Sequence, residues 1–174
     1  SRDWLIYCGS LSKVLSPGLR VGWMIAPSEL LARATMCKQF SDAHTSTYAQ
    51  ATAAEYLKSG RMPATLDHVR RVYGQRAAAM GAALRREWGD AFSFNQPQGG
   101  LFFWGRLTGA GGRISNGQAL AQKAIEHHVA FVPGAPFFAD QPDLASLRLS
   151  FATSDLDKIE EGVARLGRAL REAQ

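Results

Sequence analysis

Residues 9–23 read GSLSKVLSPGLRVGW and place a lysine, Lys13, in a polar turn between two apolar segments. The hydroxyls of Ser10 and Ser12 lie three residues and one residue before this lysine, and Arg20 follows seven residues after it. The Ser-Pro-Gly turn between Lys13 and Arg20 is expected to fold the chain back, so that both side chains face one pocket. Hydroxyls, a guanidinium and an amine suit an anionic ligand that carries an aldehyde, because a partly desolvated lysine forms a Schiff base.

Two known motifs match parts of this segment but lack their required residues. A nucleotide-binding phosphate loop needs Gly-Lys-Ser/Thr, and Lys13 instead lies between a serine and a valine. Residues 10–13 match the S-x-x-K motif of penicillin-recognising enzymes, but Ser41-Asp42 is not followed by asparagine and no Lys-Thr-Gly occurs. A plain surface turn stays open, although Arg20 would then be an unpaired charge in an otherwise apolar strand.

The apolar runs on either side of this turn, residues 5–8 and 19–26, predict two buried strands. Helices are expected over residues 28–40, with Ser28 as the cap, and over residues 48–58. Two strands do not make a self-sufficient sheet. Residues 1–60 are therefore expected to be the remnant of a larger layered α/β domain.

Apolar residues at three- and four-residue intervals predict one long amphipathic helix that begins near Pro63 and ends at Trp88. Residues 61–88 would thus connect the first part to a second one. The second part, residues 89–174, reads as a small α/β domain. Its expected strands are 101–107, 129–132 and 147–151, and its expected helices are 118–127 and a final one that begins at Ser154 with Asp157 in a capping-box-like pattern.

The strand at 147–151 carries an arginine among alternating apolar residues. Leu147, Leu149 and Phe151 would face one side, and Arg148 and Ser150 the other. That other side is either solvent or a binding surface, and the strand by itself does not distinguish them.

Several remaining residue types have ordinary structural explanations. His127 and His128 close a helix and are expected to complement its C-terminal dipole rather than bind a metal. The aromatic residues Trp88, Phe102, Phe103 and Trp104 are expected in the core or in a cleft wall rather than on a platform that stacks nucleobases.

Composition narrows the class of protein. The chain has 174 residues, of which 46% are hydrophobic and 20% are charged, so wholesale disorder is excluded. It contains no apolar run long enough for a membrane-spanning helix, and its start shows no signal peptide. Cys8 and Cys37 fit neither a metal spacing nor a disulfide framework, which favours a reducing, cytoplasmic setting. The net charge of +5 is scattered, which suits solvated helix faces and a small anionic ligand.

Four segments together carry a resemblance to a known family. Residues 10–23 resemble the cofactor-lysine segment of the class I/II aminotransferases, the fold-type I pyridoxal-phosphate enzymes. In the same order, residues 97–104, 129–134 and 147–152 resemble the glycine-pair strand, the turn beside the substrate and the carboxylate-binding arginine strand. Within the family, the chain is most similar to aminoadipate and aromatic aminotransferases and to the aminotransferase-like domain of related transcription regulators.

The resemblance implies a role for each site residue. Lys13 would form the Schiff base with pyridoxal 5'-phosphate and later shuttle a proton. Ser10, Ser12 and Arg20 would hold the cofactor phosphate, and Arg148 would pair with the α-carboxylate of the substrate. The implied activity is transamination of an amino acid with a 2-oxo acid by a homodimer, and this chain would be the C-terminal portion of the enzyme.

The family's acid for the pyridine nitrogen and its ring-stacking aromatic residue precede the lysine, whereas 12 residues precede Lys13 here. The isolated chain is therefore expected to be inactive. The alternative is the ligand-sensing domain of a transcription regulator without turnover, and nucleic acid would be a partner only if a DNA-binding domain precedes Ser1. A structural fragment with no independent function is a third possibility.

Overall fold

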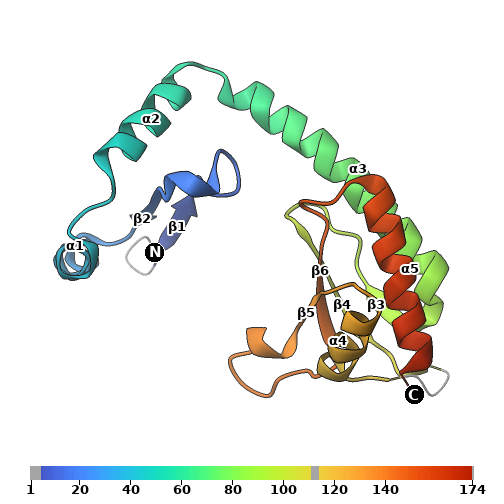
Figure 1. Cartoon of the computed structure of the whole chain (residues 1–174). Helices are drawn as coiled ribbons and strands as arrows, with labels where there is room; N and C mark the ends of the chain where they lie inside the picture. The colour runs from blue at the N-terminus through green and yellow to red at the C-terminus, as the bar shows by residue number, and fades with distance from the viewer. Residues whose placement is uncertain (1–4, 111–113, 174) are drawn as a thin grey trace. The chain divides into compact units, whose positions relative to one another are not determined.

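The structure is a computed structural model that describes residues 5–110 and 114–173. The chain divides into two compact units, Ser1–His68 and Val69–Gln174, which can be followed in Figure 1. Each unit contains helices and strands, so the predicted α/β class is confirmed. No helix among the described residues is long and apolar enough to cross a membrane.

The first unit contains a two-stranded antiparallel ribbon. Strand β1, Tyr7–Ser10, pairs with β2, Gly22–Ile25, and Tyr7 lies opposite Ile25. Both strands were predicted, but their predicted burial is wrong. Neither strand has a buried residue, and Ile25 is 62% exposed. The reason is that two strands without a second layer leave both faces of the ribbon open.

Two helices follow this ribbon, as predicted. Helix α1 spans Ser28–Asp42 and α2 spans Thr47–Lys58. The expected cap at Ser28 is wrong, because Pro27 holds the N-cap position and makes no side-chain cap bond. At α2 the hydroxyl of Ser46 accepts a hydrogen bond from the Ala49 N–H at 3.3 Å, a standard N-cap.

The predicted long helix is confirmed as α3, Met62–Trp88, with Pro63 in its first turn. From Val69 onward it belongs to the second unit, where it buries residues of its apolar stripe. The short 3-10 turns are η2, Pro17–Leu19, η3, Gly89–Ala91, and η5, Ala135–Phe137.

The second unit is built on a four-stranded antiparallel sheet with the order β3-β4-β6-β5. The strands are β3, Phe92–Phe94, β4, Phe102–Leu107, β5, Val132–Pro133, and β6, Ser146–Ser150. Strand β6 is therefore central. Its Arg148 lies opposite Trp104 of β4 on one side and opposite Val132 of β5 on the other.

One predicted strand of this unit is mostly wrong. Residues 129–131 are not a strand, because the chain there closes helix α4, Gly117–Glu126. His128 adopts a positive φ of 55°, and the Val129 N–H donates to the Ala124 carbonyl at 3.1 Å. Those residues end a helix instead of pairing with a neighbouring strand.

The core of the second unit lies on the inner face of the sheet, against α3 and the final helix α5, Leu156–Glu172. The buried Trp88 donates from Nε1 to the Val163 carbonyl at 3.2 Å and so ties α3 to α5. The predicted capping box at Ser154 is wrong, since Asp155 occupies the N-cap position without a side-chain cap bond. The largest fully buried side chains of the unit are Phe103, Phe151, Leu84, Leu107, Leu120, Leu147, Leu170 and Val163.

Candidate cofactor and carboxylate sites

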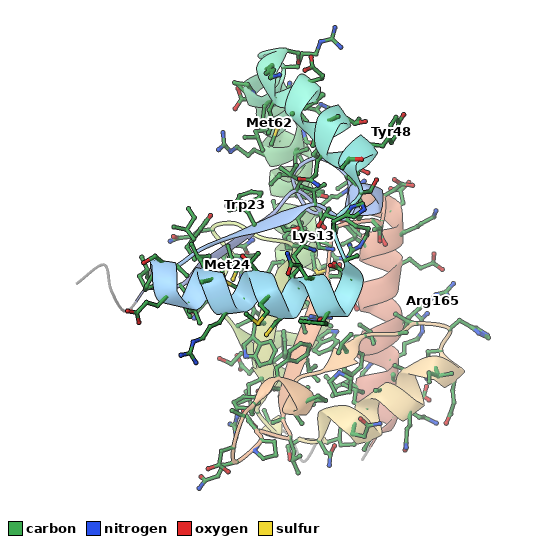
Figure 2. All side chains as sticks on the ribbon, turned by 90° about the vertical axis from the view of Figure 1, so that its left-hand side faces the viewer. Lys13, Trp23, Met24, Tyr48, Met62 and Arg165 are labelled. Atoms are coloured by element: carbon green, nitrogen blue, oxygen red, sulfur yellow. The ribbon has the colours of Figure 1, made fainter. Side chains whose placement is uncertain are left out.

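The turn after β1 is organised around one buried residue, Leu11. Its carbonyl accepts N–H bonds from residues 14–16 at 2.9 to 3.3 Å, and its own N–H donates to the Val21 carbonyl at 3.0 Å. Leu11 is 5% exposed, whereas Lys13 in the middle of the turn is exposed. The turn thus fixes the backbone around Lys13 and leaves this residue exposed. Figure 2 labels Lys13 and Trp23 in the first unit.

The two serines and the arginine of the predicted site lie next to one another. Ser10 Oγ donates to Ser12 Oγ at 2.9 Å and also accepts from the Ser12 N–H at 3.1 Å. Arg20 Nη1 lies 3.5 Å from Ser12 Oγ and 3.2 Å from the Pro17 carbonyl. Tertiary structure therefore brings Ser10, Ser12 and Arg20 into one cluster at the side of the Lys13 turn.

The backbone of Arg20 is unusual for a residue with a side chain. Its φ of 53° and ψ of 37° lie in the left-handed region, at the end of turn η2. This conformation costs roughly 1–2 kcal/mol for a residue other than glycine. The side chain that this turn carries toward Ser12 is a cation, which points to a binding role for the guanidinium.

The chemistry of this donor set fits a phosphate group. The two serine hydroxyls and the guanidinium can donate to phosphate oxygens, and guanidinium geometry matches them in a bidentate way. The sequence has no acidic residue between Asp3 and Glu29 that would repel such an anion. The same turn presents a lysine amine, so the cluster suits a phosphorylated aldehyde such as pyridoxal phosphate.

Gly9 and Trp23 pack closely against each other in the ribbon, a contact that was not predicted from the sequence. Gly9 lies opposite Trp23 in the ribbon, and a Cβ at Gly9 would overlap the indole ring of Trp23. The glycine therefore allows the indole to lie directly against β1, beside Ser10. Only the pairing register reveals this requirement.

Arg148 is the candidate residue of the second unit. Its neighbours Leu147 and Leu149 are buried in the core, while Arg148 itself is half-buried on the opposite face, as the alternation predicted. Its guanidinium carbon lies 4.3 Å from the ring centre of Phe102 and 4.5 Å from that of Phe137. Arg148 Nε is buried and has no hydrogen-bond partner among the described residues. A buried donor without an acceptor is costly, and the described residues offer this guanidinium no carboxylate, which favours an anionic ligand at its remaining N–H groups.

Trp104, which lies opposite Arg148 in strand β4, extends this aromatic group on the outer face of the sheet. The ring of Trp104 lies 5.7 Å from that of Phe137 and 6.0 Å from that of Phe138. Trp88 and Phe103 are buried in the core, as predicted. Trp104 and Phe138 line an open hollow, which agrees with the predicted cleft wall. Phe137 was not predicted as a site residue, because η5 lies outside any regular strand pattern.

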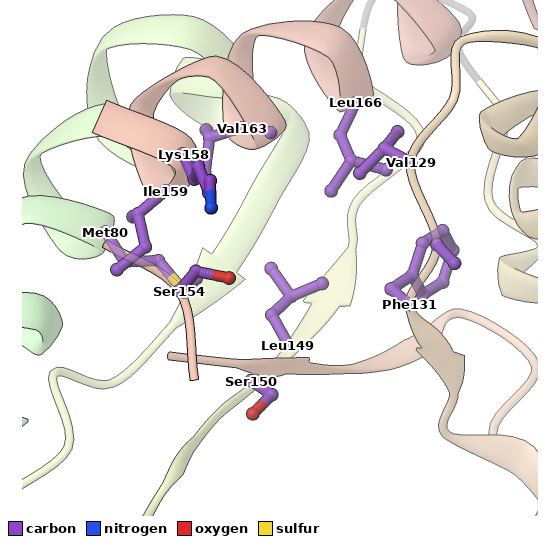
Figure 3. A pocket seen from close by; sticks show the side chains of 12 residues that line it. Met80, Val129, Phe131, Leu149, Ser150, Ser154, Lys158, Ile159, Val163 and Leu166 are labelled. Atoms are coloured by element: carbon purple, nitrogen blue, oxygen red, sulfur yellow. The ribbon is translucent and has the colours of Figure 1, made fainter. Parts of the chain in front are cut away.

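A separate cavity of about 130 Å³ lies on the inner side of the same sheet (Figure 3). Its walls are mostly apolar side chains of α5, α3 and the segment after α4, with Leu149 contributed by β6. Because Leu149 and Arg148 point to opposite faces of β6, this cavity is not part of the arginine site.

Among the described residues, no group of three His, Cys, Asp or Glu side chains could hold a metal ion. His127 ends α4, and its Nε2 lies 3.0 Å from Glu172 Oε2. Cys8 and Cys37 are exposed free thiols.

The first unit thus contains a lysine turn with a phosphate-type donor cluster, and the sheet of the second unit presents an arginine whose Nε has no partner among the described residues. The chain belongs to the class I and II aminotransferase family, whose sequence pattern matches residues 1–166. The resemblance noted from the sequence is therefore confirmed.

Known relatives agree with this membership. The chain is 46% identical over 167 residues to a 2-aminoadipate transaminase of Thermus thermophilus, covering 96% of this chain and 41% of that protein. It is 30% identical to an HTH-type transcriptional regulator of Bacillus subtilis, covering 97% of this chain and 34% of the regulator. The chain thus spans well under half of the length of the curated relatives it matches.

A solved structure gives the same fold. The α-aminoadipate aminotransferase of Thermus thermophilus, crystallised with N-(5'-phosphopyridoxyl)-L-leucine, superposes with a TM-score of 0.88 at 45% identity. The match covers 96% of this chain and 42% of that one. The fold is accordingly that of a part of an aminotransferase.

Proposed function

We propose that the gene product carrying this chain is a pyridoxal-phosphate-dependent aminotransferase that moves an amino group from an amino acid to a 2-oxo acid. The observation that carries the proposal is the cluster of Ser10, Ser12 and Arg20 beside the exposed Lys13, in a chain that belongs to this family. The relatives named above add support, since one of them was crystallised with a pyridoxyl adduct of leucine.

In this proposal residues 1–60 belong to the large cofactor-binding domain and residues 89–174 form the small domain. Residues 61–88 are the helix that connects the two domains. Pyridoxal phosphate, when bound, supplies an electron sink for the charge that develops on the substrate. Ser10, Ser12 and Arg20 bind and orient its phosphate. The Lys13 amine would hold the cofactor. Once the amine of the substrate has displaced it, the freed Lys13 amine would accept the proton that leaves the α-carbon of the amino acid.

Arg148 binds the α-carboxylate of the amino acid or of the 2-oxo acid. Its terminal guanidinium N–H groups are donors of the kind that a carboxylate accepts in pairs. The whole protein is proposed to act as a homodimer, as the family resemblance implies, in the cytoplasm.

A second function is supported by the HTH-type regulator to which this chain is 30% identical. A regulator would use the same residues to sense a cofactor or ligand and would not need turnover. The two functions differ in what precedes Ser1 in the gene, because a regulator requires a DNA-binding domain there.

Reductive trapping tests the proposed function. The gene product is incubated with pyridoxal phosphate, reduced with sodium borohydride and mapped by mass spectrometry. We expect the label on the peptide that contains Lys13 and its loss in Lys13→Ala. Lys38→Ala is the matched control, because Lys38 lies in the same unit and is held by Asp42 at 2.7 Å. A label that persists unchanged in Lys13→Ala rules out the proposed role of this lysine.

A further inference from the structure

The guanidinium of Arg148 is held by aromatic rings rather than by an acidic residue. Phe102 comes from β4, on one side of the central strand β6, and Phe137 follows β5, on the other side. Both rings lie within 4.5 Å of the guanidinium carbon. In the part of the chain that the structure describes, Arg148 makes no ion pair with Asp or Glu. Its Nε also has no hydrogen-bond partner there.

This arrangement has a specific physical consequence. The hydrogen-bond donors of a guanidinium lie in its plane, whereas aromatic rings attract the cation through their faces. Rings therefore restrict how the side chain turns without using up its N–H groups. A carboxylate neighbour would also fix the side chain, but it would neutralise the charge and compete with an incoming carboxylate.

We propose that Phe102 and Phe137 form an aromatic clamp that positions the Arg148 guanidinium for the substrate carboxylate. The inference rests on the proposed function, in which Arg148 binds that carboxylate. The two rings are positioning residues: they pre-orient the guanidinium before ligand arrives, so that less rotamer freedom is lost on binding. Phe102 is 37% exposed and Phe137 is 51% exposed, so neither ring is held there by burial in the core.

The test compares how the purified gene product binds a charged ligand and an uncharged ligand of the same shape. The probes are 4-methylpentanoate, which is leucine without its amino group, and its neutral amide, 4-methylpentanamide. Calorimetry gives the dissociation constant of each probe. The dissociation constant of the amide divided by that of the carboxylate measures how strongly the protein recognises the charge. We expect this ratio to fall about fivefold in Phe102→Leu and in Phe137→Leu, because each loses part of the pre-orientation.

Two further variants make the test selective. Phe137→Tyr keeps an aromatic face and should restore the ratio to within about twofold of the parent protein. Phe138→Leu is the matched control, since Phe138 is 39% exposed and its ring contacts Trp104 rather than the guanidinium. Its ratio should stay unchanged.

The other outcomes overturn the proposal in distinguishable ways. An equal loss of carboxylate and amide binding would mean that the rings are only an apolar wall. An equal fall in Phe138→Leu would mean a general loss of packing, and a fall in one clamp variant alone would refute a two-ring clamp. If Arg148→Ala leaves the ratio unchanged, the carboxylate role of Arg148 itself fails, and the clamp fails with it.

Discussion

Replacement of Arg20 separates the chemistry of its guanidinium from the strain of its backbone. Arg20→Ala and Arg20→Gly both remove the cation that lies 3.5 Å from Ser12 Oγ. Only glycine adopts the observed φ of 53° without steric cost. The two variants should therefore bind the cofactor equally poorly but differ in folding stability.

The magnitudes follow from the contacts. Hydrogen bonds to a charged group contribute about 1.5–3 kcal/mol, so the loss of the guanidinium should weaken pyridoxal phosphate binding by about 10- to 150-fold. Glycine relieves a left-handed strain of roughly 1–2 kcal/mol. Glycine also lowers stability by about 0.5–1 kcal/mol, because it gives the unfolded chain more freedom. The net gain in stability of Arg20→Gly over Arg20→Ala should therefore be up to about 1.5 kcal/mol.

The assay is equilibrium dialysis with pyridoxal phosphate and, separately, with pyridoxal, which lacks the phosphate. Both Arg20 variants should lose affinity for the phosphorylated compound and keep their affinity for pyridoxal. Arg33→Ala, on helix α1 of the same unit, is the control for the loss of one positive charge. Equal losses for the two compounds would refute the phosphate assignment. Full affinity in Arg20→Gly would show that the backbone and not the guanidinium matters.

Three further perturbations have defined outcomes. Arg148→Ala should weaken amino-acid binding about 100-fold, by removing a bidentate charge-assisted pair, while cofactor affinity measured by dialysis stays within about twofold. Phe103→Ala, at a side chain that is 0% exposed, should lower the free energy of unfolding by about 3–5 kcal/mol in denaturant titration, and a cost below about 1 kcal/mol would contradict its place in the core. Partial burial opposes ionisation of Asp143, but hydrogen bonds from Ala145 and Ser146 and the Arg106 guanidinium outweigh it and lower the pKa of that carboxyl below its ordinary 3.8. Its stabilisation is therefore present above pH 3.8 and lost as pH falls below that value, so Asp143→Asn should flatten the acid side of a stability-against-pH curve.

Local pattern was a good guide to elements whose partners lie within the described units. The three- and four-residue spacing gave the long helix α3, and the alternation of Leu147, Arg148 and Leu149 gave the faces of β6. Apolar pattern did not predict burial correctly where burial depends on a second layer of structure packed on the strands. Ile25 of the ribbon is an example, since it is largely exposed. Apolar pattern also failed at residues 129–131, where a helix end used the backbone groups that a strand would need.

The sequence by itself determined the chemical types in the candidate sites and the family to which they belong. A lysine after an apolar strand, two hydroxyls, an arginine after a Ser-Pro-Gly turn and another among alternating apolar residues are local facts, and their order along the chain is specific. Tertiary structure alone decided which groups meet. The fold-back at η2 brings Arg20 to Ser12, and the strand order β4-β6-β5 brings Phe102 and Phe137 to Arg148. Periodicity reports which face a residue occupies, but the neighbours on that face are set by strand pairing between segments far apart in the chain.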